Sequence, residues 1–156
     1  MNLRANRMSA EEASEIAGWT YEAPYEFYNN EPSPAMIREL MSEPYFTVYD
    51  AAAGPVPVGF FCSGNAAQVP NDAYPYSADY VDIGIDMRPD LTGKGNGGPF
   101  LAFVLEQIGQ SFGERPFRLT VARFNQRAIR LYERFGFSRR HEFVKGSTTF
   151  IVMVRP

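Results

Sequence analysis

One glycine-rich segment constrains this chain more than any other feature: residues 90–99 read DLTGKGNGGP. The segment follows residues 80–87, where apolar and polar residues alternate as in a strand. It precedes residues 100–112, which are apolar almost all round, so we expect a buried helix there. Glycines let successive N–H groups converge on one point, and a helix N-terminus adds partial positive charge. The strand–loop–helix order therefore predicts a site for a phosphate or pyrophosphate group.

Two common phosphate-binding loops do not account for this segment. A P-loop needs Ser or Thr directly after Gly-Lys, whereas Lys94 is followed by Gly95. Gly93, Gly95 and Gly98 do match the G-x-G-x-x-G spacing of a dinucleotide fold. That fold places the loop early and closes the next strand with an acidic residue, but here the next strand ends in Val-Ala-Arg. A dinucleotide-binding enzyme is therefore the weaker interpretation.

The rest of the chain reads as short helices and strands. Ser9 and Glu12 form a capping box, Ser33 before a proline starts a second helix, and Asn125 caps a helix that Gly136 ends. Strands are expected over residues 2–8, 45–50, 56–63, 80–87, 117–122, 137–144 and 148–154. A polar loop at residues 64–79 has a length that is often involved in binding. The order predicts a single mixed α+β domain over residues 1–156, with one parallel strand–helix–strand unit in the middle.

Composition excludes several classes of protein. Lys and Arg number 15 against 18 Asp and Glu, so a net charge of -3 gives no general basic field for nucleic acid. Cys62 is the only cysteine and His141 the only histidine, which excludes a disulfide framework and a Cys/His metal site. No apolar run reaches the ~20 residues of a membrane span, and no signal-peptide core is present at the start. We therefore expect a cytoplasmic protein with no metal, no nucleic-acid partner and no membrane contact.

Two motifs together resemble the GNAT superfamily of N-acetyltransferases. Residues 92–97, TGKGNG, are similar to that family's pyrophosphate loop, Q/R-x-x-G-x-G/A, with Thr92 in place of Gln or Arg. Residues 119–137, LTVARFNQRAIRLYERFGF, look like its strand, an Asn, and then A-x-x-L-Y-x-x-x-G-F. The two motifs lie at the distance expected in that family. The resemblance implies an α+β fold whose central mixed, mostly antiparallel sheet is flanked by helices and contains two splayed parallel strands.

The same resemblance implies an acetyl-CoA-dependent N-acetyltransferase, in which a primary amine attacks the thioester directly in a ternary complex without a metal. The acceptor is a small-molecule amine or a protein amino group, and the sequence leaves open which. The alternative is a catalytically silent CoA-binding sensor or regulatory module, which would keep the glycine loop and discard the acid and base. The final hairpin offers a strand edge for a homodimer.

The resemblance also implies roles for individual residues. It places Tyr132 beside the departing sulfur as the general acid, and Asn125, about two helical turns or ~10 Å earlier, shares its helix face. Related N-terminal acetyltransferases often carry Glu where this chain has Thr120, so we expect Asp82 to act as the base, with Asp86 as a weaker rival. The expected cofactor-binding residues are Ile85 and Met87 (through their backbones), Thr92, Gly93, Lys94, Gly95, Asn96, Gly97, Gly98, Asn125 and Tyr132.

An aromatic, acidic segment precedes the second predicted helix, where the family usually builds its acceptor pocket. Its rings are Trp19, Tyr21, Tyr25, Phe27 and Tyr28. Packing explains most of them. The neighbouring Glu22 and Glu26 would nonetheless suit a cationic amine, through charge and ring-face attraction.

Overall fold

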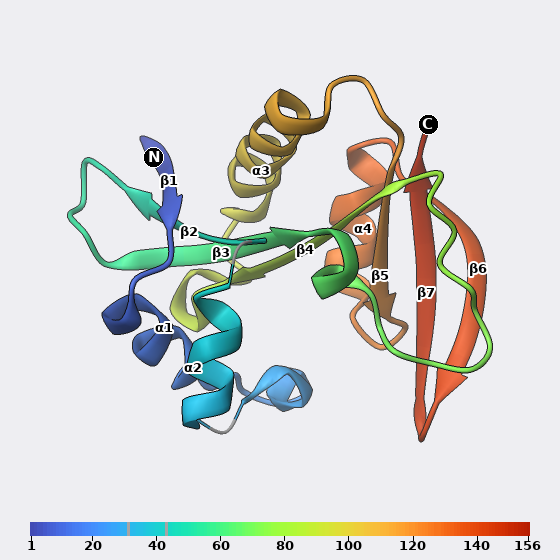
Figure 1. The fold of residues 1–156 in the computed structure, drawn as a ribbon, viewed down its shortest axis with the longest axis horizontal. Coiled ribbons are helices and arrows are strands. Elements are labelled where there is room, and N and C mark those ends of the chain that lie inside the picture. Colours follow the sequence, from blue (N-terminus) through green and yellow to red (C-terminus); the bar gives the residue numbers. More distant parts are fainter. Residues whose placement is uncertain (31, 43) are drawn as a thin grey trace. The chain divides into compact units, whose positions relative to one another are not determined.

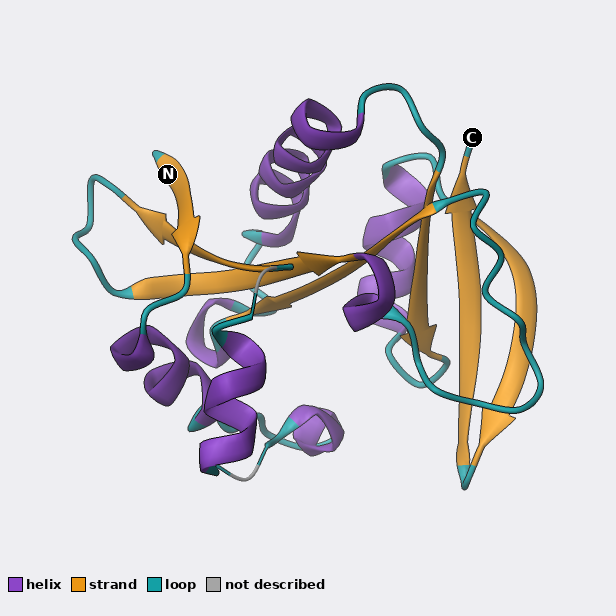
Figure 2. Cartoon of the chain, viewed as in Figure 1, coloured by secondary structure: helices purple, strands orange, loops and turns teal. Residues whose placement is uncertain are grey.

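The structure is a computed structural model that describes residues 1–30, 32–42 and 44–156 (Figure 1). The chain contains both strands and helices (Figure 2). The strands are β1 (Leu3–Arg7), β2 (Tyr45–Asp50), β3 (Pro57–Ser63), β4 (Val81–Met87), β5 (Phe117–Ala122), β6 (Ser138–Lys145) and β7 (Thr148–Arg155). The α-helices are α1 (Ala10–Ala17), α2 (Pro34–Leu40), α3 (Gly97–Phe112) and α4 (Gln126–Arg134), and 3₁₀ turns lie at Tyr25–Tyr28, Gly64–Ala67 and Pro89–Leu91.

The strands form a mixed sheet in the order β1-β2-β3-β4-β5-β7-β6. β1 with β2, β2 with β3, β5 with β7, and β6 with β7 are antiparallel pairs, whereas β4 and β5 run parallel. The predicted α+β class, with its mostly antiparallel sheet and its parallel strand–helix–strand unit, is confirmed.

The chain divides into two compact units. Residues 1–62 and 85–104 form the first unit, and residues 63–84 and 105–156 form the second. The expectation of a single domain stays a prediction.

Helix caps in the first unit follow the local sequence. The Ser9 hydroxyl accepts the Glu12 N–H at 3.1 Å, and the Glu12 carboxylate accepts the Ser9 N–H at 2.9 Å, so the predicted capping box starts α1. Ser33 caps α2 in the same way through its hydroxyl. α1 packs beside α2, and Ile16 and Leu40 are buried. Short-range hydrogen bonds therefore decide where both helices begin.

Gly59 on β3 permits a close approach within the first unit. A Cβ at this position would lie 2.5 Å from two ring carbons of Phe100 and 2.6 Å from the carbonyl oxygen of Asp86. Beside it, the Arg88 N–H donates to the Val58 carbonyl at 2.8 Å. A side chain at position 59 would push α3 away, so this glycine fixes the start of α3 close to β3 and β4.

The second unit is organised around the β6–β7 hairpin. β7 pairs along the whole of β5, from Arg155 opposite Phe117 to Phe150 opposite Ala122, and β6 and β7 lie side by side in Figure 1. Gly146 in the hairpin turn has a φ of 62°, a left-handed value that glycine adopts without strain. Apolar side chains close the core of this unit: Ala122, Phe143, Phe150 and Val152, with Val69 and Tyr74 packed against them.

One expectation about α3 is wrong. Its buried residues are Phe100, Leu101, Val104, Leu105 and Ile108. Ala102, Glu106 and Gln110 are exposed at four-residue spacing, so the helix is amphipathic and not buried all round. Within the described part of the chain, no helix combines the length and apolar character that a membrane crossing requires.

Candidate active site

The glycine loop, residues 92–98, leads from a 3₁₀ turn into the first turn of α3. Gly93 and Gly95 have φ values of 70° and 82°, in the left-handed region that favours glycine. Residues 92–95 form a turn, and among the described residues the backbone N–H groups of residues 93–98 make no hydrogen bond of good geometry. A Cβ at Gly95 or Gly98 would meet no atom within 4 Å. Unpaired amides beside open space, at the start of a helix of 16 residues, can bind an anion such as a phosphate.

Two polar side chains of the loop bind the loop itself. The Thr92 hydroxyl donates to the Pro89 carbonyl at 2.7 Å, and the Asn96 amide donates to the Leu91 carbonyl at 2.9 Å. Lys94 is exposed. Thr92 and Asn96 therefore hold the shape of the loop, and their predicted contacts with a cofactor stay predictions.

Pairing between β4 and β5 is confined to two residue pairs. Val81 lies opposite Phe117 and Asp82 opposite Arg118, whereas β5 continues to pair with β7 as far as Ala122. In a parallel ladder, strand groups beyond the last pair lose their partners on that side. This short register agrees with the splayed parallel strands that the sequence implied.

Asp82, the expected base, forms a buried ion pair. Its two oxygens accept from the Arg118 guanidinium at 2.6 and 2.8 Å, and Gln68 donates to it at 2.9 Å. The side chains of Arg118 and Asp82 are 0% and 4% exposed. These bonds favour a structural role, and the assignment of Asp82 as base remains untested. Arg118 was missed in the sequence, although a charged residue inside an apolar strand signals a need for a buried counter-ion.

Residues 64–79 were expected to be a loop of a length often involved in binding, and the structure shows how this loop and Tyr80, which follows it, are fixed within the second unit. The Arg118 guanidinium lies 5.0 Å from the ring centre of Tyr76, 5.1 Å from that of Tyr80 and 5.9 Å from that of Tyr74. The Tyr76 hydroxyl bonds to the Thr120 hydroxyl at 2.8 Å. Three tyrosines therefore hold the loop to β5.

α4 has the local structure that its sequence predicts. The Asn125 side chain accepts the Ala128 N–H at 3.2 Å, which confirms the N-cap. Gly136 has a φ of 91°, and the Phe137 N–H donates to the Tyr132 carbonyl at 3.1 Å, as in a Schellman motif. Tyr132 is 8% exposed, with its ring edge-on to Phe137 at 6.2 Å. Asn125 and Tyr132 thus share one helix, and their roles toward a cofactor stay predictions.

Asp86, also on β4, has an unusual environment in the first unit. The Tyr21 hydroxyl lies 2.6 Å from Asp86 Oδ1 and 2.7 Å from the Met87 carbonyl oxygen. The Tyr21 N–H donates to Asn29 Oδ1 at 2.6 Å, and this bond holds together the segment from Tyr21 to Asn29. Burial raises the pKa of Asp86 to about 7, opposed by hydrogen bonds from Tyr21 and the Met87 N–H. Burial and the Asp86 charge raise the pKa of Tyr21 as well.

The predicted site residues fall in both units. Ile85, Met87 and the glycine loop belong to the first unit, whereas Asp82 and the α4 residues belong to the second. Ile85 and Met87 are partly exposed. Across the described ranges, no three His, Cys, Asp or Glu side chains gather closely enough to hold a metal ion.

Comparison with known proteins gives a family and a fold. The model of the acetyltransferase (GNAT) family matches residues 11–137. Among solved structures, aminoglycoside acetyltransferase AAC(6')-Ib in complex with coenzyme A is 18% identical, with 99% of this chain and 94% of that chain covered and a TM-score of 0.73. A spermidine N-acetyltransferase chimera from Vibrio cholerae and hSSAT is 18% identical, with 99% and 95% covered and a TM-score of 0.70.

A third structure of the same fold is yncA, a putative acetyltransferase from Salmonella typhimurium with its cofactor acetyl-CoA. It is 15% identical, with 99% of this chain and 93% of that chain covered and a TM-score of 0.64. At these identities the likeness shows the fold alone. No curated protein sequence matches the chain significantly.

Proposed function

The chain belongs to the acetyltransferase (GNAT) family, and from that premise we propose that it is an acetyl-CoA-dependent N-acetyltransferase acting on a primary amine. The observation that carries the proposal is the run of unpaired backbone amides at residues 93–98, where α3 begins. Structures of the same fold include acetyltransferases named for spermidine and for aminoglycosides, and complexes with coenzyme A or acetyl-CoA. A small-molecule amine is therefore the acceptor class that we propose.

The glycine loop has the chemistry to hold the phosphate end of acetyl-CoA. The N–H groups of residues 93–98 would bind the pyrophosphate, and the exposed Lys94 would add a cation beside it. Ile85 and Met87 would bond to the pantetheine amides through their backbones. At Met87 such a bond would replace one already present, because the Met87 carbonyl accepts from the Tyr21 hydroxyl and the Met87 N–H donates to Asp86.

The proposed reaction is an acyl transfer that needs few protein groups. The amine nitrogen loses a proton and attacks the thioester carbon; a C–N bond forms, the C–S bond breaks, and its electron pair leaves on sulfur. Tyr132 would protonate the thiolate and regain a proton from solvent, into which the nitrogen releases its second proton. The products are an amide, a free thiol and one net proton. Because a thiolate is a fair leaving group, loss of Tyr132 should slow turnover without abolishing it.

Coenzyme A binding tests the role of the loop. Gly95→Ala would place a methyl group in the open space beside the amides, and Gly113→Ala is its matched control, because Gly113 also has a left-handed φ (71°) and no atom within 4 Å of its Cβ position. Both variants should lose about 1 kcal/mol of stability through backbone strain. Only Gly95→Ala should weaken coenzyme A binding, by about tenfold or more in calorimetry. Equal affinities in the two variants and the parent would contradict the loop assignment.

Thiol release from acetyl-CoA tests catalysis, with a panel containing a polyamine, an aminoglycoside, an amino acid and a peptide with a free amino terminus. Tyr132→Phe should lower kcat by about 100-fold. Tyr49→Phe is the control, because Tyr49 on β2 is partly exposed and its hydroxyl has no hydrogen bond within the described chain. Full activity in Tyr132→Phe would remove Tyr132 from the mechanism. Coenzyme A binding without thiol release would instead favour the catalytically silent CoA-binding module.

A further inference from the structure

We propose that Asp86, positioned by Tyr21, is the base that takes the proton from the ammonium group of the acceptor. This inference rests on the proposed function above and adds to it the residue that activates the amine. Both residues lie in the first unit, and their side chains are in direct contact. The expected substrate is an amine that is positively charged near neutral pH.

The hydrogen bonds around the Tyr21 hydroxyl can accommodate one additional proton on Asp86. Its hydroxyl is 2.6 Å from Asp86 Oδ1 and 2.7 Å from the Met87 carbonyl oxygen. Both are acceptors when Asp86 is ionised, yet a phenol has only one proton to donate. A protonated Asp86 can donate to the Tyr21 oxygen while Tyr21 donates to the Met87 carbonyl, so each short contact then has its own proton. The geometry is therefore suited to an Asp86 that gains and loses a proton.

The two acidic residues of β4 differ in how their charge is balanced. Asp82 is neutralised by Arg118 at 2.6 Å. Asp86 has no Lys or Arg within ion-pair distance among the described residues, and Arg88, two positions away, pairs with Asp90 at 2.6 Å. A carboxylate already bound by a guanidinium is a weak proton acceptor, whereas an unneutralised one in a desolvated position is a strong one. This difference in charge balance favours Asp86 over Asp82 as the base.

The groups around Asp86 explain its proton affinity. Tyr21 is the titratable side chain in contact with it, and the Met87 N–H is the other polar group that acts on it. β3 approaches the Asp86 backbone through Gly59, where the Phe100 ring of α3 also packs. No Lys or Arg in the described part of the chain forms an ion pair with Asp86, and burial raises the pKa of Asp86 to about 7. A base whose pKa lies near the working pH is ionised often enough to act and basic enough to take a proton.

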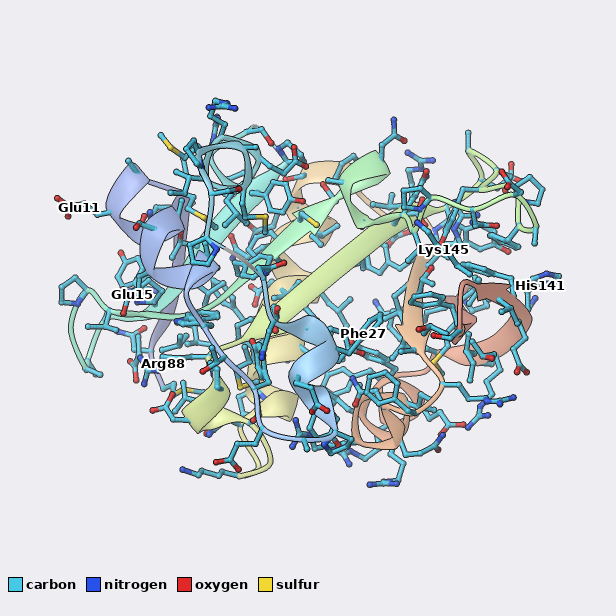
Figure 3. All side chains as sticks on the ribbon, turned by 90° about the horizontal axis from the view of Figure 1, so that it is seen from below. Glu11, Glu15, Phe27, Arg88, His141 and Lys145 are labelled. Carbon is cyan, nitrogen blue, oxygen red and sulfur yellow. The ribbon has the colours of Figure 1, made fainter. Side chains whose placement is uncertain are left out.

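The segment that carries Tyr21 also has the chemistry to attract a cation. The Tyr21 and Tyr28 rings are edge-on at 6.4 Å, and the Tyr28 and Phe27 rings at 5.2 Å. Phe27 is 47% exposed and is labelled on its short helical turn in Figure 3. Glu22 and Glu26, on the same stretch, are exposed. Ring faces and carboxylates both favour an approaching ammonium group.

The proton transfer balances without any further reactant. The Asp86 carboxylate takes one proton from R–NH₃⁺, which leaves R–NH₂ and a neutral Asp86 carboxyl group. Tyr21 then accepts from Asp86 and donates to the Met87 carbonyl. Asp86 then gives the proton to solvent after the amine has reacted, which restores the carboxylate for the next turnover.

The experiment is a pH profile of kcat/KM for the amine, from about pH 5.5 to 9, in the full chain and three variants. Asp86→Asn keeps the side-chain shape without the base, and kcat/KM at pH 7 should fall by about 100-fold or more, with loss of the acidic limb near pH 7. The Tyr21 hydrogen bond is stronger to the charged Asp86 carboxylate than to the neutral acid, so it lowers the Asp86 pKa even though both forms can be hydrogen-bonded. In Tyr21→Phe the acidic limb should therefore move to higher pH, and activity should recover there. Asp72→Asn, in an exposed loop, is the control and should match the parent.

Coenzyme A affinity, measured in the same samples, separates this inference from the proposed function. Unchanged affinity in both site variants, with the expected pH profiles, supports the inference. Two results in an active parent would overturn the inference alone. One is an Asp86→Asn variant that is as active as Asp72→Asn. The other is a Tyr21→Phe pH profile whose acidic limb does not move to higher pH. A parent that binds no coenzyme A or acetylates no amine overturns the proposed function and this inference with it. If circular dichroism shows that Asp86→Asn is unfolded, the Tyr21→Phe profile decides.

Discussion

Removal of one partner of the buried ion pair between Arg118 and Asp82 should strongly destabilise the second unit. The guanidinium bonds to both carboxylate oxygens and to the Ser77 carbonyl at 2.8 Å, and three tyrosine rings surround it. Arg118→Met would keep most of the side-chain volume and remove the charge. Asp82 would then be a buried carboxylate with Gln68 as its remaining side-chain donor.

The cost of Arg118→Met follows from that unpaired charge. Removing one partner of a buried ion pair costs about 3–5 kcal/mol, because the other charge remains desolvated. Arg118→Met also loses the contacts between the guanidinium and the tyrosine rings. These contacts belong to the same network as the ion pair, so their energy is not additive with this cost. For a urea m-value of about 2 kcal/mol/M, the unfolding midpoint should fall by about 2 M.

A double variant shows whether the unpaired charge is the cause. Arg118→Met with Asp82→Leu leaves no buried charge, and replacing a buried ion pair by apolar residues is often close to neutral. The double variant should therefore recover at least half of the stability lost in Arg118→Met, measured by urea unfolding. A loss below about 0.5 kcal/mol in Arg118→Met would refute the reasoning. So would a double variant whose loss of stability equals the sum of the losses in Arg118→Met and in Asp82→Leu alone.

Three further predictions follow from single contacts. Gly59→Ala should cost about 1–3 kcal/mol, because its Cβ would lie 2.5 Å from the Phe100 ring; an unchanged urea midpoint would contradict this packing. Asn125→Ala should cost about 1 kcal/mol by removing the cap on the Ala128 N–H, and Asn125→Asp, which keeps a capping oxygen, should restore the thermal midpoint. The pKa of Asp86 is about 7 in the folded chain against 3.8 as a model value, so the folded chain keeps a proton that the unfolded chain releases, and the free energy of unfolding should fall as the pH rises from about 4 to 7. Asp86→Asn should remove that slope, which is at most about 1.4 kcal/mol per pH unit; equal slopes in variant and parent would show that Asp86 titrates normally.

Features set by neighbouring residues could be predicted from the sequence. The capping box at Ser9 and the N-cap at Asn125 need only a side chain and an N–H three residues later. β2 and β5 occupy the predicted residues, because their apolar runs are bounded by turn signals. The left-handed glycines of residues 92–98 are likewise a local property of the chain. The glycine loop could therefore be predicted from the sequence, because it does not depend on distant contacts.

Only the tertiary structure decided how the charged groups are used. Asp82 and Asp86 are four residues apart on one strand, and nothing in their local sequence separates a neutralised carboxylate from an unneutralised one. The partner of Asp82 is 36 residues away and the partner of Asp86 is 65 residues away. Which side chains burial brings together, and how far it removes them from water, sets the energy of each charge. The sequence alone therefore located the loop for which we propose an anion site, whereas folding determined which acidic group is paired with a cation and which is not.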